Sequence, residues 1–512
     1  MHDDLLTRLA LLGPLRVTAR TSVTDYRNTP KTARQIGEEL GVASLVEGSV
    51  QRAGNRIRVS ARLVDAKSAT PLWTKSYDRD LKDLFAIEAE LATGIATSLK
   101  APDASRLAKE PSRNLAAYDF YLREQQLGDR ALLQRIELLS EAVSFDPSFA
   151  LAWARLASLQ SRAHPARAKQ AFERAQALAP GDLRVKLESG SYYADALQDL
   201  PRAAKAFEEV LDAAPGSVDA LLGLARVRGL ELRWDERAAL LERTLALDPR
   251  NLRTLADLSW QYREFRRWDL AVARLRQAAD LRPDEPAVHA DLAWVEYLRT
   301  GSWAAFDEWR RRLPAGIDAC CGLVRDVDIA RALARRDLAA AARLADVDTA
   351  DSNTATEAQR LCREVERVLI LRAAADARAA QAVQEALHKV DKVVVHDRDV
   401  AGLGCKAQLQ AATGQRLTAL FTLATELKRA SGNGLLITLA ERDRARMHAL
   451  LGERKEALAA LKALLPLPGT SGYALLTDIA LASLWDDAEF QRLAGHPASN
   501  EAVSYDIKYA LK

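Results

Sequence analysis

The sequence predicts a mainly α-helical protein, a solenoid of stacked helical hairpins preceded by a small α/β domain. The first observation is a row of prolines at Pro147, Pro180, Pro215, Pro249 and Pro283, which are 33, 35, 34 and 34 residues apart. The second is the alanine- and leucine-rich composition between them, and the third is a change to short strand-like runs before residue 100. A period near 34 is typical of helix pairs, because one pair cannot bury its own apolar face and must stack on neighbours.

The first hundred residues are expected to form the α/β domain. Gly41 ends one helix as a C-cap should, and Arg52-Ala53-Gly54-Asn55 is a good hairpin turn. The expected elements, in order, are a helix at 3–12, a strand at 15–20, a helix at 32–40, strands at 43–50, 56–64 and 71–77, and a helix at 83–100. This order of helices and strands predicts a small α/β unit.

Small and large residues alternate at fixed positions within the hairpins. Small residues let two helices approach closely, and the large residue four positions later fills the space between them. The second helices carry such pairs at Ala168 and Phe172, Ala203 and Phe207, and Ala271 and Leu275, and tryptophans mark the turn at Trp234, Trp268 and Trp303. This pattern resembles the tetratricopeptide repeat. It predicts repeats at 114–314, degenerate repeats at 315–468, a linker at 101–113 and a C-terminal capping segment at 469–512.

Other motifs resemble a second family. They are DDLLTRL at 3–9, ARTS at 19–22, IGEELGV at 36–42, VEGSV at 46–50, RVSARLVD at 58–65, LW at 72–73, YDR at 77–79, NLAAYDFYL at 114–122 and LWDDAEFQRL at 484–493. In this order they resemble the TolB amino-terminal-like (FlgO-like) domain and the tetratricopeptide array that follows it. The resemblance implies the accessory, sensory half of a bacterial signalling protein. That half commonly follows a class III nucleotide cyclase, a winged-helix regulator or a protein kinase, often across one membrane helix.

The chain departs from this pattern in two ways. It contains no effector domain or membrane helix, and it starts after the apolar strand with which the family begins. In the family that strand would lie between 15–20 and 43–50, and its absence would leave unpaired ladder groups on both neighbours. Either the chain is a fragment or begins late, or another segment fills the gap.

Composition narrows the classes of function. The net charge of +3 over 512 residues argues against a nucleic-acid-binding stripe. Four cysteines, at Cys320, Cys321, Cys362 and Cys405, have neither a metal-binding spacing nor the density of a disulfide framework. No apolar run of about 18 residues exists and the start is not that of a signal peptide. The expectation is a soluble, cytoplasmic protein, although the resemblance allows a membrane-tethered or periplasmic placement.

Motifs for catalysis and cofactors are missing from the sequence. It has no phosphate-binding loop, no H-E-x-x-H and no G-x-S-x-G. Gly402-Leu403-Gly404 loosely imitates a dinucleotide turn, but a polar stretch at 396–399 intervenes and no βαβ unit surrounds it, so a helix start in a degenerate repeat is the simpler interpretation. The carboxylates of 346–353 imitate a calcium loop without its turn glycine, and a solvated loop is the alternative. The sequence therefore predicts no metal, no cofactor and no enzymatic activity.

One group of residues predicts a binding surface. Positions two, five, nine and twelve of the first helix of each repeat face the concave side of a tetratricopeptide solenoid. Arginine offers a fork of donors to carboxylates, and flat aromatics supply contact area at low entropic cost. The residues at these positions are Arg184, Ser191, Arg226, Arg253, Trp260, Arg263, Trp294 and Tyr297. They predict a groove for a protein or peptide with acidic groups; the alternative is that the tryptophans pack locally and the arginines form a solvated face.

The predicted function is accordingly a non-enzymatic protein–protein interaction scaffold in bacterial signalling or regulation. The alternative is the regulatory fragment of a class III adenylate or guanylate cyclase, or of a winged-helix transcription regulator, whose effector domain lies upstream.

Overall fold

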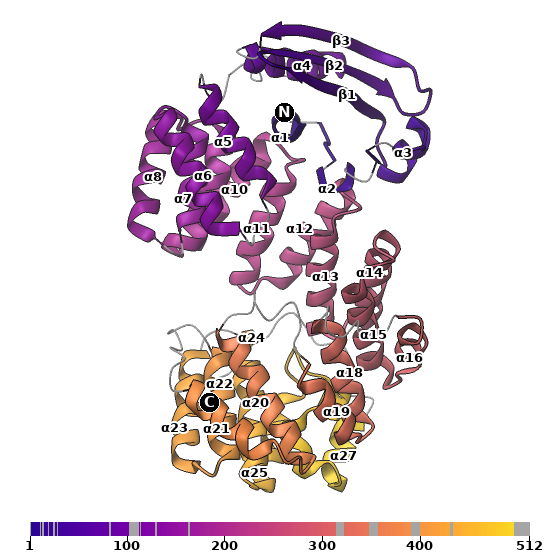
Figure 1. Ribbon diagram of the computed structural model, residues 1–512, viewed down its shortest axis with the longest axis vertical. Coiled ribbons are helices and arrows are strands. Elements are labelled where there is room, and N and C mark those ends of the chain that lie inside the picture. Colours follow the sequence, from indigo (N-terminus) through magenta and orange to yellow (C-terminus); the bar gives the residue numbers. More distant parts are fainter. Residues whose placement is uncertain are drawn as a thin grey trace. The chain divides into compact units, whose positions relative to one another are not determined.

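The chain divides into two compact units, residues 1–254 and 255–512, each considered by itself (Figure 1). The computed structural model describes residues 2–10, 12, 15–18, 20–23, 26–27, 29–80, 83–101, 112, 114–127, 131–161, 164–313, 322–347, 357–390, 400–430 and 434–495. Helical hairpins follow a three-stranded sheet near the N-terminus. The predicted fold class, a mainly α hairpin solenoid with a small α/β part in front, is confirmed.

The α/β part contains three of the four predicted strands and all three predicted helices. Its elements are α1 (His2–Ala10), α2 (Arg20–Val23), α3 (Ala33–Leu40), β1 (Ser44–Ala53), β2 (Arg56–Asp65), β3 (Pro71–Asp80) and α4 (Leu84–Ser98). Thr32 closes a capping box with Gln35 at the start of α3, and Gly41 ends that helix with φ 65°. The strands pair antiparallel in the order β1-β2-β3.

The sheet is apolar on one face only. Ile57, Val59 and Leu63 of β2 are buried on the face that α4 covers (Figure 1). The intervening residues point to solvent, where Arg56 and Arg58 form ion pairs with Asp78 at 2.6 and 2.7 Å. This alternation follows from the two-residue period of a strand and places the core of the α/β part between sheet and helix.

The strand predicted at 15–20 is wrong. Residues 15–18 have no regular secondary structure, and residues 20–23 form the short helix α2. Leu15 and Val17 pack against the cluster of α1 and α4, and Ser22, which is fully buried, donates a hydrogen bond to Asp248 in the repeats. The alternating pattern that indicated a strand is therefore satisfied by tertiary packing. Among the described residues, β1 is left as an edge strand of the sheet.

The repeats form pairs of helices joined by short turns. In the first unit the helices are α5 (Leu115–Gln126), α6 (Leu132–Phe145), α7 (Ala150–Gln160), α8 (Pro165–Leu178), α9 (Leu183–Tyr192) extended by η5 (Tyr193–Leu197), α10 (Leu200–Ala213), α11 (Val218–Leu230) and α12 (Trp234–Leu247). The helix α13 (Leu252–Glu264) crosses the division between the units. All five landmark prolines lie between one pair and the next, as predicted.

The second unit continues the hairpins. Its helices are α14 (Trp268–Leu281), α15 (Pro286–Thr300), α16 (Ala304–Arg310), α18 (Gly322–Ala334), α19 (Leu338–Ala345), α20 (Glu357–Ala373), α21 (Ala379–Val390), α22 (Val400–Ala412), α23 (Arg416–Ala430), α24 (Gly434–Leu450), α25 (Arg454–Leu464), α26 (Gly472–Leu475), η7 (Ile479–Leu484) and α27 (Ala488–Gly495). A disulfide between Cys362 and Cys405 links α20 to α22. The adjacent Cys320 and Cys321 lie outside the described residues.

A left-handed residue recurs at the turn inside the hairpins. The recurring positions are Gln198, Leu232, Arg266, Gly301, Arg336, Ala375, Gly414 and Gly452, all with φ between 51° and 81°. Successive members are 34, 34, 35, 35, 39, 39 and 38 residues apart. The repeat thus lengthens in the second half of the array, which explains why its sequence pattern there looks degenerate.

Candidate functional site

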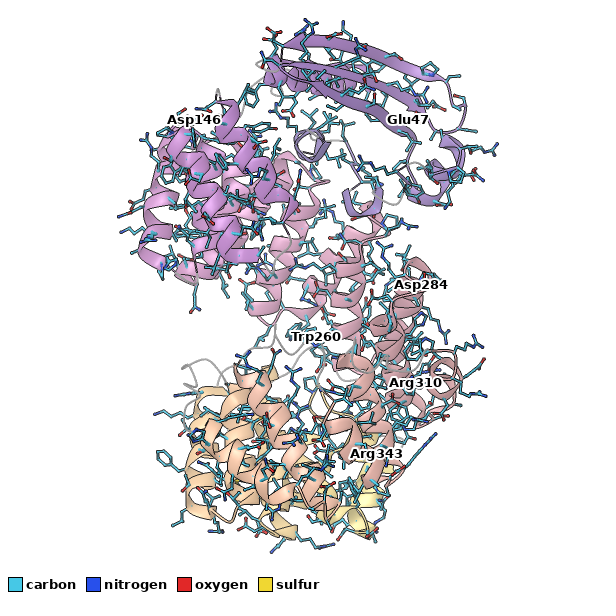
Figure 2. All side chains as sticks on the ribbon, in the orientation of Figure 1. Glu47, Asp146, Trp260, Asp284, Arg310 and Arg343 are labelled. Carbon is cyan, nitrogen blue, oxygen red and sulfur yellow. A yellow bond between two sulfur atoms is a disulfide. The ribbon has the colours of Figure 1, made fainter. Side chains whose placement is uncertain are left out.

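The eight predicted groove residues lie on four first helices. Arg184 and Ser191 are on α9, Arg226 is on α11, Arg253, Trp260 and Arg263 are on α13, and Trp294 and Tyr297 are on α15. Arg253 is exposed, and Ser191 and Trp260 are half-buried (Figure 2 labels Trp260). The first four belong to the first unit and the last four to the second, so we describe the two sets separately.

Three of these arginines already hold carboxylates of the chain itself. Arg184 pairs with Asp182 at 3.2 Å, and Arg226 pairs with Asp195 at 2.7 Å. Arg263 lies 3.1 Å from Asp291 and 3.3 Å from Glu264. A ligand carboxylate would therefore have to replace an internal partner at each of them, an exchange of one charged hydrogen bond for another.

Tyr297 is part of the packed core of the second unit. Only 2% of it is exposed, and its ring stacks on Trp303 with centroids 4.1 Å apart. Burial raises the pKa of its phenol well above the ordinary value. Trp294, which is half-buried, stacks on Tyr297 at 5.7 Å. Packing in the core therefore explains why an aromatic residue occupies position 297, since a large ring stabilises the fold most when it is buried.

A carboxylate that the sequence analysis missed lies on the same helix row. Asp219 occupies position two of α11, as Arg184 does on α9 and Arg253 on α13. It is exposed and has no ion pair or hydrogen bond within the described part of the chain. Desolvation by surrounding protein atoms raises its pKa, and Arg155 opposes this shift. Asp219 is thus a carboxyl group whose surroundings disfavour the charged form, and the repeat spacing was the signal that could have found it.

Next to it, a ladder of charges ties successive first helices together. Glu124 of α5 is fully buried and accepts from Arg135 of α6 at 2.7 Å. Arg155 of α7 lies 3.5 Å from Glu124 and 3.0 Å from Glu188 of α9. These carboxylates raise the pKa of Arg155. Glu124, Arg135, Arg155 and Glu188 thus have charged partners within the row, whereas no ion pair of Asp219 is found among the described residues.

The dinucleotide-like Gly402-Leu403-Gly404 lies inside helix α22, as the simpler interpretation predicted. Gly404 faces the carboxylates of Asp443 and Glu426 so closely that a Cβ there would overlap Asp443. Both carboxyls are buried, with Glu426 fully buried and Asp443 2% exposed. Burial, followed by the charge of Asp443, raises the pKa of Glu426 to about 10. The glycine admits a carboxyl pair into the helix interface.

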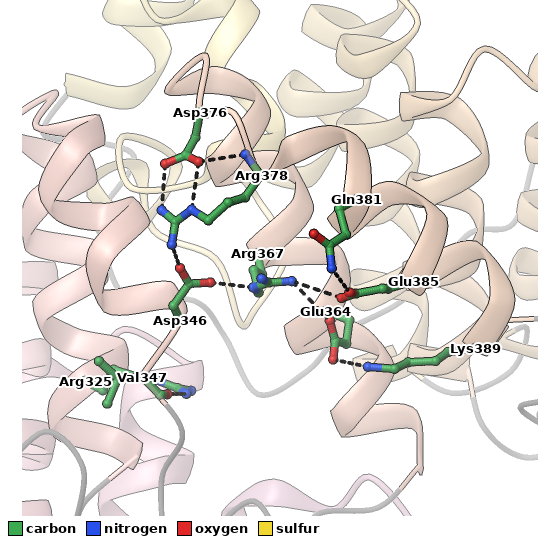
Figure 3. A network of polar contacts seen from close by, with 10 residues as sticks. All are labelled: Arg325, Asp346, Val347, Glu364, Arg367, Asp376, Arg378, Gln381, Glu385 and Lys389. Carbon is green, nitrogen blue, oxygen red and sulfur yellow. Dashed lines mark hydrogen bonds and ion pairs between the residues drawn. The ribbon is translucent and has the colours of Figure 1, made fainter.

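Most of the calcium-like carboxylates at 346–353 lie outside the described residues, because residues 348–356 are not described. Asp346 forms ion pairs with Arg367, at 2.6 Å, and with Arg378 (Figure 3). Arg378 also pairs with Asp376 at 2.6 Å. Asp346 therefore joins helix pairs through arginines. Among the residues that the structure describes, no three metal-ligating side chains come together.

Comparison with known proteins gives partial matches. No family model matches the chain. A putative adenylate cyclase 3 of Rhizobium meliloti (strain 1021) is 34% identical over 162 residues, which are 30% of this chain and 28% of that protein. The chain thus spans less than a third of this relative's length.

Among solved structures, PilW, a type IV pilus biogenesis factor, is 17% identical with a TM-score of 0.34, covering 41% of this chain and 94% of its own. A thermophilic TPR protein of Thermus thermophilus is 19% identical with a TM-score of 0.32, covering 35% and 99%. YrrB, described as a TPR protein with an unusual peptide-binding site, is 15% identical with a TM-score of 0.24, covering 40% and 89%. In the described residues, no helix has the length and apolar character needed to cross a lipid bilayer.

Proposed function

We propose that this chain is a non-enzymatic scaffold that binds a protein partner, in the form of an extended peptide, along the first helices of its repeats. The observation that supports it most is the row of polar side chains at equivalent repeat positions, Arg184, Asp219 and Arg253, carried by helices that bury other faces in the core. Regularly spaced side chains on a rigid surface are suited to a ligand with its own regular spacing.

The charge of the ligand is the finer part of the proposal. An acidic peptide would bind by exchanging with the internal partner of Arg226 in the first unit or with that of Arg263 in the second, whereas a basic group beside Asp219 would favour the ionised form of this carboxyl. Contacts of either kind weaken as salt screens them. Acidic and basic ligands therefore predict opposite responses to Asp219→Asn, because removing an anion strengthens binding of the first and weakens binding of the second.

The test is titration of the protein with acidic, basic and neutral extended peptides of equal length. For an acidic ligand, Arg253→Ala with Arg263→Ala should weaken binding by about 2–5 kcal/mol where the pairs are desolvated. Arg202→Ala is a matched control, since that arginine is 67% exposed on the second helix α10. If neither the arginine variant nor the Asp219 variant changes the affinity for any of the peptides, the first helices are not the binding surface.

The second candidate is the regulatory part of a signalling enzyme. It is favoured by the similarity to the putative adenylate cyclase 3, of which this chain spans 28%. The coding sequence upstream of Met1 tests it directly. An in-frame cyclase or winged-helix domain would support this candidate, and a stop codon directly upstream would count against it.

The disulfide bears on the compartment. Disulfides persist mainly in oxidising compartments, so Cys362–Cys405 favours a periplasmic placement over the cytoplasmic one that the sequence suggested. Thiol labelling of Cys362 and Cys405 in intact cells, before and after reduction, would distinguish the two. Reaction of these two cysteines without reductant would contradict the periplasmic placement.

A further inference from the structure

The segment Leu465–Leu476 of the second unit lies along the ends of the hairpins rather than inside a helix pair. Near its start, the guanidinium of Arg266 donates to three main-chain carbonyls, those of Leu467 at 3.1 Å, Thr470 at 2.6 Å, and Leu465. The amide of Gly469 in turn donates to the carbonyl of Glu264 at 2.7 Å. These contacts join main chain to main chain or side chain to main chain.

The second half of the segment is held in the same manner. The hydroxyl of Tyr297 donates to the carbonyl of Tyr473 at 3.1 Å, and the Tyr473 ring covers Gly301 so closely that a Cβ there would lie 2.8 Å from it. Arg336 donates to the carbonyl of Leu476 at 2.8 Å and stacks on Trp485 with 3.8 Å to the ring centroid. Here again backbone carbonyls accept the hydrogen bonds, while the side chains of Tyr473 and Leu475 pack against the core of the second unit.

Arg266, Gly301 and Arg336 are equivalent residues of three successive repeats. Each is the left-handed residue of its hairpin turn, and they are 35 residues apart. A non-glycine residue in this conformation is strained. At the two arginine positions, hydrogen bonds to one segment offset that strain. We call Glu264, Arg266, Tyr297, Gly301 and Arg336 the turn rim.

The arginines of the turn rim differ from those of the predicted groove. Arg266 is 4% exposed, and its partners among the described residues are carbonyls, with no carboxylate. Burial without an opposite charge lowers its pKa to about 10, which leaves it cationic at neutral pH. Since no carboxylate neutralises this buried cation, the carbonyl dipoles of the segment stabilise its charge. Every polypeptide main chain carries such carbonyls.

We propose that the turn rim is a binding site for an extended polypeptide main chain, and that the chain's own segment Leu465–Leu476 occupies it in cis. The partner is an apolar, proline-containing segment like this one, which reads Leu-Pro-Leu-Pro-Gly-Thr-Ser-Gly-Tyr-Ala-Leu-Leu. Proline suits this site because it keeps its carbonyl, and one amide of the segment, that of Gly469, bonds the rim. The proposal rests on the scaffold function but places a second ligand on a different surface.

Occupation in cis explains how such a site would be regulated. A tethered segment acts at an effective concentration on the order of millimolar, so a partner in solution cannot compete while the segment is seated. A change that releases the segment would therefore open the site. The competing explanation is that the segment is a permanent structural cap of the last repeats.

The test uses full-length protein and a fluorescent peptide corresponding to residues 463–478. Gly469→Pro should release the segment, because proline lacks the amide that bonds Glu264 and cannot adopt the φ of +77° found here. Tyr473→Ala is a second release variant that leaves the rim intact. Wild type should bind the peptide at least about tenfold more weakly than either release variant, a difference of about 1.4 kcal/mol.

Arg266→Ala, added to each release variant, tests the site. This substitution should abolish the gain in peptide binding. Arg312→Ala, at an arginine that is 73% exposed and lies outside the rim, is the matched control and should leave the gain unchanged. Hydrogen exchange should show residues 465–476 opening in the release variants while α13 and α15 stay protected.

Three outcomes would overturn the proposal. They are release of the segment without a gain in peptide binding, a gain that survives Arg266→Ala, and loss of protection throughout α13 and α15 in both release variants. The last would identify the segment as a structural cap. Failure of the first-helix groove is measured separately with Arg253→Ala and Asp219→Asn alone. The third groove variant, at Arg263, is left out of this comparison because Arg263 pairs with Glu264 of the rim.

Discussion

Phe207 shows how a single side chain decides the packing of a repeat. It is 1% exposed, and its ring lies against Gly190 of α9 and Gly223 of α11, where a Cβ would come within 2.7 and 2.4 Å of it. Two successive first helices thus close on one aromatic ring of α10. Small residues at the contact are what allows this approach, as the alternation of small and large residues predicted.

Phe207→Ala should lower the free energy of unfolding by about 3–5 kcal/mol, since it leaves a large cavity between three helices. Phe421→Ala is the control, because that ring is 76% exposed, and it should change stability by less than about 0.5 kcal/mol. Urea unfolding of both variants measures the difference. Equal effects at the two positions would show that Phe207 is not buried as described.

The carboxyl of Glu426 should make stability depend on pH. Its pKa is about 10 when folded and near 4.5 when unfolded, so the folded chain binds more protons between these values. The stability that the protonated form supplies is present below about pH 4.5 and is lost as pH rises toward 10. Glu426→Gln, which mimics the neutral form, should flatten the decrease of unfolding free energy between pH 5 and pH 9.

The control for this experiment is Glu38→Gln, at an exposed residue whose side chain is 67% accessible. Its pH profile should follow that of the wild type. A Glu426→Gln profile as steep as the wild type would contradict the buried, protonated carboxyl.

At the scale of elements, the hairpin turn is the unit that repeats most faithfully. The left-handed residue returns once in each of these hairpins, even where helix sequences diverge and the spacing lengthens. A turn that reverses the chain between two packed helices has few allowed geometries, whereas helix faces tolerate many apolar residues. The turn therefore preserves the register of the array.

Relief of left-handed strain gives a prediction with two opposite signs. Gln198→Gly should stabilise the protein by up to about 1 kcal/mol, because Gln198 is exposed and adopts a φ of 54°. Gly414→Ala should destabilise it by about 1 kcal/mol, since a Cβ there meets no atom within 4 Å and backbone strain alone opposes it. Thermal melts measure both effects. If the melting temperatures of the two variants shift in the same direction, the described turn geometry is contradicted.

The disulfide constrains two neighbouring hairpins. Cys362 and Cys405 close a loop with a sequence separation of 43, so reduction should cost about 2–4 kcal/mol of stability in the second unit. The double variant Cys362→Ser, Cys405→Ser should melt alike with and without reductant, while the wild type should melt lower when reduced. A wild type that is insensitive to reductant would show that the bond does not stabilise the fold.

At the scale of the molecule, the α/β part is continuous with the first repeats. Phe85 of α4 meets Tyr118 of α5 with ring centroids 4.8 Å apart, and the Tyr118 hydroxyl donates to the buried Glu88 of α4 at 2.9 Å. Both parts lie in the unit 1–254. The domain boundaries drawn from the sequence, at 100 and 114, stay predictions about independent folding.

Tyr118→Phe tests this continuity. It removes one donor from a buried carboxylate and should cost about 1–3 kcal/mol. Hydrogen exchange should increase in both α4 and α5, because the two helices share the contact. An increase confined to one of them would indicate that the α/β part and the repeats open independently.

The sequence by itself determined the repeat architecture, the hairpin boundaries at the five prolines and the three strands. These features depend on local chemistry: proline ends a helix pair, glycine and asparagine turn a hairpin, and small residues alternate with large ones. The predicted groove residues lie on first helices of the hairpins, since repeat position follows from spacing alone, and their role in binding stays a prediction.

Only the tertiary structure decided what those residues contact. Leu15 and Val17 pack on helices instead of pairing as a strand, Arg226 and Arg263 hold internal carboxylates, and Arg266 holds the carbonyls of a segment about two hundred residues away. Periodicity reports which face a side chain is on, but charge pairing and main-chain contacts depend on which distant segment arrives there. Such contacts are set by the packing of the whole array, which no local pattern records.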